Sequence, residues 1–126
     1  MARGILQQLK ASDIFEDRSL TTIPFTVDTT YVNNGANVRC RARGKTVFME
    51  ISISLKALTA STSAYQVGSI PADYAPPFSM TSVIMNISSQ QTMVFQVKAD
   101  GSVEVFCPGS NGPAGWYDGS IMWMLD

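Results

Sequence analysis

The chain has 126 residues, enough for one domain with a single hydrophobic core, and 45% of them are hydrophobic. Charged residues make up 15%, below the roughly 25% that is usual in soluble domains, and the formal net charge is −1. This composition argues against disorder and gives no general attraction to nucleic acid or to anionic membranes.

The absence of histidine narrows the possible chemistry further. It excludes Ser-His-Asp and Cys-His catalysis and removes the commonest zinc ligand. No stretch approaches the roughly 20 consecutive apolar residues of a membrane-spanning helix, and residues 5–9 are too short and too mixed for a secretory signal. We therefore predict a protein without metal, cofactor, nucleic-acid partner or membrane insertion.

Residues 4–11, Gly-Ile-Leu-Gln-Gln-Leu-Lys-Ala, form the one predicted helix, with Ile5, Leu6 and Leu9 on a common face. Two helical turns are marginally stable alone in water, so this segment suits the end of a stalk or a short docking helix. We interpret residues 1–20 as an N-terminal helical connector and residues 21–126 as a β-sandwich domain.

The central feature of that domain is a hairpin in Val38–Leu55. Apolar and polar residues alternate strictly on both sides of Gly44-Lys45, which is typical of strands with one buried and one wet face. A two-residue loop with Gly first predicts a type II′ turn. The resulting register pairs Ala42 with Val47, Cys40 with Met49 and Val38 with Ile51 inside, and Arg43 with Thr46, Arg41 with Phe48 and Arg39 with Glu50 outside.

A second hairpin is predicted in Met93–Cys107, with a three-residue loop at Ala99-Asp100-Gly101. This loop pairs Val97 with Val103, Phe95 with Val105 and Met93 with Cys107. Further strands are expected at residues 23–27, 65–68, 80–87 and 119–125. About eight strands at regular spacing, without strand–helix alternation, predict an all-β antiparallel sandwich or jelly-roll-like fold.

The closing strand, Gly119–Leu125, is apolar on both faces. One explanation is a central strand whose outer face is covered by a loop. The other is burial against identical chains, which the low charge content favours. With the short helix at Ile5–Leu9, this predicts a homotrimer, and Trp123→Asp is then expected to lose assembly or solubility before anything else.

The two cysteines, Cys40 and Cys107, both fall on apolar strand faces and are predicted to be buried free thiols. A disulfide would require their strands to be neighbours.

Trp116-Tyr117-Asp118 is the leading candidate for a binding site, predicted to lie at the end of a Gly- and Pro-rich loop in residues 108–118. Aromatic rings stack on the apolar faces of sugars, and a carboxylate accepts hydrogen bonds from sugar hydroxyls. Alternatively, Trp116 anchors the loop to the core. The second candidate cluster is Tyr65, Asp73 and Tyr74, which Arg41 could join from a neighbouring chain. No pair of carboxylates can be placed together from sequence, so a glycosidase site has no positive support.

Four segments in a fixed order carry a resemblance to a known family. They are the Val38–Leu55 hairpin with its Arg-Gly-Lys turn, the Gly68–Pro77 segment with its Ile-Pro-x-x-Tyr-x-Pro pattern, the Asp100-Gly101 hairpin, and Gly119-Ser120-Ile121-Met122-Trp123. Over residues 21–126 the sequence resembles the C-terminal head domains of tailed-phage tail-fibre and baseplate receptor-binding proteins.

The resemblance implies a trimeric β-sandwich head at the tip of a virion tail, assembled in the host cytoplasm beside other tail or baseplate proteins. It also implies that the head binds host cell-wall or surface polysaccharide in clefts at or between protomers. The binding residues of this family vary too much to be carried over. We therefore expect a non-enzymatic, saccharide-binding head, with a structural tail module as the alternative and a glycan-degrading enzyme as a third class.

Overall fold

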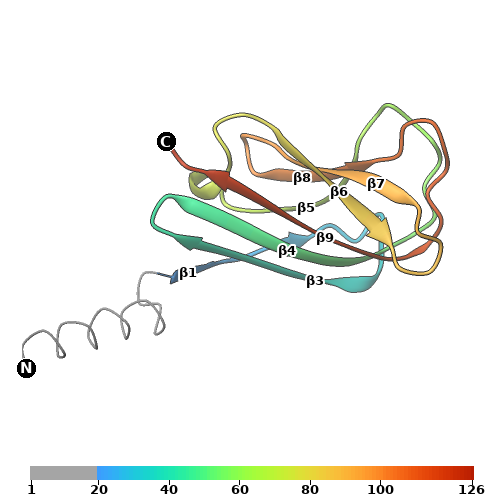
Figure 1. Ribbon diagram of the computed structural model, residues 1–126, viewed down its shortest axis with the longest axis horizontal. Coiled ribbons are helices and arrows are strands. Elements are labelled where there is room, and N and C mark those ends of the chain that lie inside the picture. Colours follow the sequence, from blue (N-terminus) through green and yellow to red (C-terminus); the bar gives the residue numbers. More distant parts are fainter. Residues whose placement is uncertain (1–19) are drawn as a thin grey trace, which may run out of the picture.

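The computed structural model describes residues 20–126, which form one antiparallel sheet of nine strands (Figure 1). The all-β prediction is confirmed, while the helix expected at residues 4–11 lies outside the described residues. The elements are β1 (Leu20–Ile23), β2 (Thr26–Val27), β3 (Val32–Arg43), β4 (Thr46–Leu55), β5 (Tyr65–Ser69), the short 3-10 helix η1 (Ala72–Tyr74), β6 (Met80–Asn86), β7 (Thr92–Val97), β8 (Ser102–Phe106) and β9 (Gly115–Met124).

The sheet is curled on itself rather than split into the two separate sheets of a sandwich. Its spatial order is β1-β3-β4-β9-β6-β7-β8-β5-β2. Strands β1 and β2 stand at opposite ends of this order, yet only Pro24-Phe25 separates them in the chain. The two ends of the sheet must therefore approach each other. Figure 1 shows β1, β3 and β4 in one layer and β5, β7 and β8 in the other. The layers are joined because β9 pairs with both β4 and β6.

The central hairpin has the predicted register, from Val38↔Ile51 through to Arg43↔Thr46. Gly44 has a φ of +58°, and Lys45 is not among the residues with positive φ, so the turn is type II′ as expected. In the second hairpin the pairs Phe95↔Val105 and Val97↔Val103 are also confirmed. These registers direct alternate side chains into the core.

The core lies between the two layers and contains the inward-facing residues of nearly every strand. Its largest fully buried side chains include Met49, Leu55, Ile84, Phe95 and Tyr117. At one end the indole nitrogen of Trp123 donates a hydrogen bond to the backbone oxygen of Tyr74 at 2.9 Å. This bond ties β9 to η1, the segment that carries the Ile-Pro-x-x-Tyr-x-Pro pattern.

Both thiols are free and buried. Cys40 lies on the inner face opposite Met49, and Cys107 contacts the backbone oxygen of Thr59 through its sulfur at 3.3 Å. Burial raises the pKa of the Cys40 thiol to about 11. Since the thiolate is the reactive form, Cys40 should react slowly in the folded protein.

We expect a disulfide-exchange reagent at pH 8 to label Cys40 at least about a hundredfold more slowly in the folded protein than in urea. The raised pKa also gives a pH dependence of the free energy of unfolding. An exposed thiol has a pKa of about 8.5, so the contribution of protonated Cys40 is complete below that pH. It is lost as the pH rises through about 11. Rapid labelling of the folded protein, or a mass lower by two hydrogens, would contradict this assignment.

The two apolar faces of the closing strand differ in burial. Ile121 and Trp123 point into the core, whereas Met122 and Met124 are 63% and 60% exposed. No loop of residues 20–126 covers the outer face of this strand, so that explanation of its apolar character is wrong for the described part of the chain.

Candidate functional site

Trp116, Tyr117 and Asp118 lie in strand β9 and not in a loop, because β9 pairs with β4 along its whole length, from Gly115 to Met124. The strand therefore directs these side chains alternately. Trp116 and Asp118 are exposed, while Tyr117 is 0% exposed and its hydroxyl donates to the backbone oxygen of Pro113 at 2.7 Å. Burial raises the pKa of Tyr117. Tyr117 is thus an anchor of the preceding loop and cannot stack on a ligand.

The second predicted cluster is not formed. Tyr65 begins β5, whereas Asp73 and Tyr74 lie in η1, beyond the other end of that strand. Tyr65 packs edge-on against Tyr31, with ring centroids 4.8 Å apart, and its hydroxyl donates to the backbone oxygen of Thr59 at 2.8 Å. Tyr74 is half-buried and supports Trp123 through its carbonyl. These tyrosines have structural roles in the described chain.

Polar side chains gather instead on the outer face of β3, β4 and β9. Two adjacent rows cross these strands, Asn37↔Ser52↔Asp118 and Arg39↔Glu50↔Ser120. The rows line a shallow cleft of about 530 Å³, whose full lining is Asn37, Arg39, Glu50, Ile51, Ser52, Asp118, Gly119 and Ser120.

The charges of this outer face divide into a paired and an unpaired set. Arg41 makes an ion pair with Glu50, and its guanidinium lies 5.4 Å from the centre of the Phe48 ring, within the range of a cation–π contact. Arg39 and Asp118 make no ion pair and no side-chain hydrogen bond with another residue of the described part, 20–126. The guanidinium of Arg39 and the carboxylate of Asp118 are therefore the charges that the cleft can offer to a ligand.

Trp116 borders this cleft from β9. It is two residues from Asp118 on the same face, which places their α-carbons about 7 Å apart. Its backbone oxygen accepts a hydrogen bond from the backbone amide of Ile87 at 3.1 Å, so the exposed apolar side chain of Ile87 lies near it, and that of Met85 lies beside Asp118. The structure thus places Trp116, Asp118 and Arg41 on one outer face of the same chain, with Trp116 and Arg41 beyond opposite ends of the cleft that Asp118 lines.

The sequence interpretation missed Asn37, Arg39, Ser52 and Ser120. Asn37, Arg39 and Ser52 could have been placed on one face from the hairpin register. Their proximity to Asp118 could not, because no turn joins β4 to β9: the 59 residues from 56 to 114 lie between the end of β4 and the start of β9.

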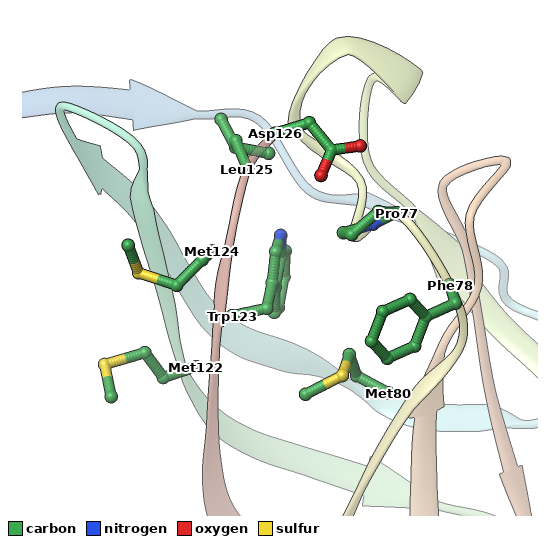
Figure 2. Close-up of a pocket in the computed structure, with 8 residues that line it drawn as sticks. All are labelled: Pro77, Phe78, Met80, Met122, Trp123, Met124, Leu125 and Asp126. Carbon is green, nitrogen blue, oxygen red and sulfur yellow. The ribbon is translucent and has the colours of Figure 1, made fainter.

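A second, apolar hollow lies at the other end of β9 (Figure 2). Its volume is about 400 Å³, and Figure 2 shows Trp123 between β9 and the segment that carries Phe78 and Met80. Phe78 is 67% exposed, comparable to Met122 and Met124. Within residues 20–126, the hollow is lined by Pro77, Phe78, Met80, Met122, Trp123, Met124, Leu125 and Asp126.

Within residues 20–126 there is no cluster of three or more side chains that could hold a metal ion. The same part of the chain has no helix long and apolar enough to span a membrane.

Comparisons with known proteins identify a structural relative. No family model matches the sequence, and no curated protein matches it either. Among solved structures, the crystal structure of the head domain of lactococcal phage bIL170, described among the receptor-binding domains of lactococcal phages, matches with a TM-score of 0.64 at 14% sequence identity. The match covers 82% of this chain and 99% of that one. The chain therefore has the fold of a phage receptor-binding head domain.

Proposed function

We propose that this chain is the receptor-binding head of a phage tail and that it binds a host-surface saccharide without chemically changing it. The observation that carries the proposal is the shared fold with the bIL170 head domain over nearly all of that domain. The polar cleft bordered by Trp116 supports the choice of a saccharide, because sugars need both hydrogen-bonding groups and an apolar stacking face.

Each group of the cleft has a complementary part on a sugar. The Asp118 carboxylate accepts hydrogen bonds from hydroxyls, while Arg39 and Asn37 donate to ring or hydroxyl oxygens. The hydroxyls of Ser52 and Ser120 can do either. All of these side chains stand on paired strands rather than loops, so the sheet holds them in place before the ligand arrives.

A shallow cleft of this kind is expected to bind weakly, on the order of millimolar or about −4 kcal/mol. Three linked sites on one virion tip raise the effective affinity by avidity, which is how a weak site can hold a host cell. The proposed head is accordingly a homotrimer at the tail tip, attached to other tail or baseplate proteins and assembled in the host cytoplasm.

The exposed apolar surface formed by Phe78, Met122 and Met124 supports the trimer. These three side chains are each at least 60% exposed, and they surround the hollow of Figure 2. Large apolar patches of this kind on a soluble protein mark interaction sites, because their burial releases ordered water. Covering them with identical chains would also explain the low charge content.

We expect light scattering to give about three times the chain mass of 13.7 kDa at micromolar concentration. Met122→Lys combined with Met124→Lys should reduce this to the monomer mass, since two charges would have to be buried at the contact. The melting temperature of the isolated domain should change little, because both side chains are exposed. A monomer mass for the unmodified protein would contradict the trimer.

A glycan array with hydrolysis assayed in parallel tests the function itself. Binding without release of sugar fragments is the expected result. Absence of binding to any host glycan would favour the alternative, a structural tail module. Cleavage would show an enzyme, although Glu50 is held in an ion pair with Arg41 and Asp118 is the one other carboxylate of residues 20–126 that lines the cleft.

A further inference from the structure

Strand β9 is paired on only one side over its C-terminal half. Its ladder with β4 runs to Met124, but its ladder with β6 consists of Met85↔Asp118 and Asn86↔Tyr117. Beyond Asp118, β9 has β4 as its only partner strand within residues 20–126, although it stands in the middle of the sheet. The β6–β9 junction is still closed at Ser120, where the Ser82 hydroxyl bonds the backbone, and it opens beyond that residue.

The backbone groups that face this opening can be identified from the alternation of the strand. The amide of Leu125 donates to Lys45, in the β3–β4 turn, at 2.7 Å, so odd-numbered residues of β9 face β4. Ser120 faces β6, because its carbonyl accepts from the Ser82 hydroxyl at 2.7 Å. By the same alternation, the backbone amides and carbonyls of Met122 and Met124 point into the opening. Such groups need a hydrogen-bonding partner when they are covered.

The opening is shaped for a short extended segment. It begins beyond the hydrogen bond between Ser82 and Ser120 and ends at Asp126, and it contains the hollow of about 400 Å³ shown in Figure 2. The five residues from Met122 to Asp126 span about 17 Å when extended. Among residues 20–126, Asp126 is the one charged residue that lines the hollow. An occupant should therefore be a strand of four or five residues with basic groups at one end.

Strand β1 has this length, and its second edge pairs with no other strand of residues 20–126. It is four residues long and, within that part of the chain, pairs with β3 alone, in the register Thr21↔Ala42 and Ile23↔Cys40. The tight turn at Gly44-Lys45 directs the backbone groups of Arg43 and Arg41 toward β4, so those of Ala42 and Cys40 face β1. The amide of Thr22 consequently points away from β3, to the open side.

The charge beside β1 and the position of β1 in the molecule both suit the opening next to β9. Beside β1, strand β3 carries Arg41 and Arg43, which make this edge basic although Glu50 already pairs with Arg41, and a basic edge complements Asp126 at the end of the opening. Figure 1 shows β1 and the C-terminal end of β9 at the same end of the molecule. A ring of identical copies needs two different surfaces on each copy, and the β1 edge and the β9 edge are two such surfaces.

We propose that β1 of one copy pairs along the open edge of β9 in the next copy, so that the subunits are joined by backbone hydrogen bonds as well as apolar contacts. This inference rests on the trimer of the proposed function. It adds that each subunit gives its β1 edge to one neighbour and its β9 edge to the other, so the contacts run in one direction around the ring.

Proline variants test it on the full chain. Met122→Pro and Thr22→Pro each remove an amide that points away from the paired neighbour, which an edge position tolerates. The controls are Met122→Val and Thr22→Val, which keep the amide. We expect the trimer of each proline variant to dissociate at a protein concentration at least tenfold higher than that of its valine control. The molecular mass measured by light scattering across a dilution series gives this concentration.

Hydrogen exchange of the unmodified protein keeps the test decisive if a proline variant fails to fold. The amides of Thr22, Met122 and Met124 should exchange at least tenfold more slowly above the dissociation concentration than below it. If the protein is a trimer and the proline and valine variants dissociate alike, strand pairing is wrong. If Met122→Pro alone weakens the trimer, β1 is not the occupant. A monomer at every concentration would instead remove the trimer itself.

Discussion

Replacing Trp123 by aspartate is expected to unfold the domain rather than to separate its subunits. The Trp123 side chain is 3% exposed and packs in the core against the β4 side of the sheet, where it pairs with Val47. Its indole also donates the 2.9 Å hydrogen bond to Tyr74. The expectation from sequence is that this variant loses assembly or solubility before anything else. Because the structure places Trp123 in the core, we instead expect unfolding to come first.

The free-energy cost of Trp123→Asp is comparable to the whole stability of a small domain. Truncating a buried tryptophan costs about 3–5 kcal/mol, and an unpaired carboxylate in the same place adds a desolvation penalty. Small domains are stable by only about 5–15 kcal/mol. Circular dichroism should thus show loss of the sheet or a melting temperature lower by tens of degrees. Met124→Asp, on the exposed face of the same strand, is the matched control and should keep the native melting temperature of the domain.

Removing either unpaired charge of the cleft is expected to weaken saccharide binding strongly. Hydrogen bonds to charged groups contribute about 1.5–3 kcal/mol, so Arg39→Ala or Asp118→Asn should lower single-site affinity by about tenfold to a hundredfold. On a trimer the loss is larger, since avidity multiplies the change at each site. Trp116→Ala should also lower the saccharide affinity, because it removes the aromatic ring on which the sugar would stack.

The control for these variants is Glu104→Gln, which removes a charge from strand β8, outside the cleft lining. It should bind host cells as well as the unmodified protein does. All four variants should keep the same mass and melting temperature, because the replaced side chains are on the outer surface. Undiminished binding by Arg39→Ala and Asp118→Asn together would place the site elsewhere.

The elements that were predicted well from sequence are those fixed by nearby residues. The Val38–Leu55 hairpin follows from period-two alternation around a two-residue turn, and a register slip would have buried arginines. The same reasoning gave the Phe95↔Val105 pairing. In both cases the chain itself brings the strands together, so local turn chemistry decides the pairing.

The features that sequence could not give depend on long-range pairing. Ile121–Leu125 is apolar throughout, so only its pairing with β4 shows that Trp123 faces inward and Met122 outward. The same pairing extends β9 back to Gly115 and converts a predicted loop into strand. It also places Asp118 in the row of Ser52 and Asn37, which is how the cleft arises.

The most direct test of the saccharide site is nuclear magnetic resonance of the isotope-labelled protein titrated with the glycan that the array identifies. The account predicts that the amide signals that shift most belong to the outer face of β3, β4 and β9, centred on Arg39, Ser52 and Asp118, and that they move with one common dissociation constant. Shifts confined to the loops near Tyr65 or Asp73, or no shifts at saturating glycan, would contradict it.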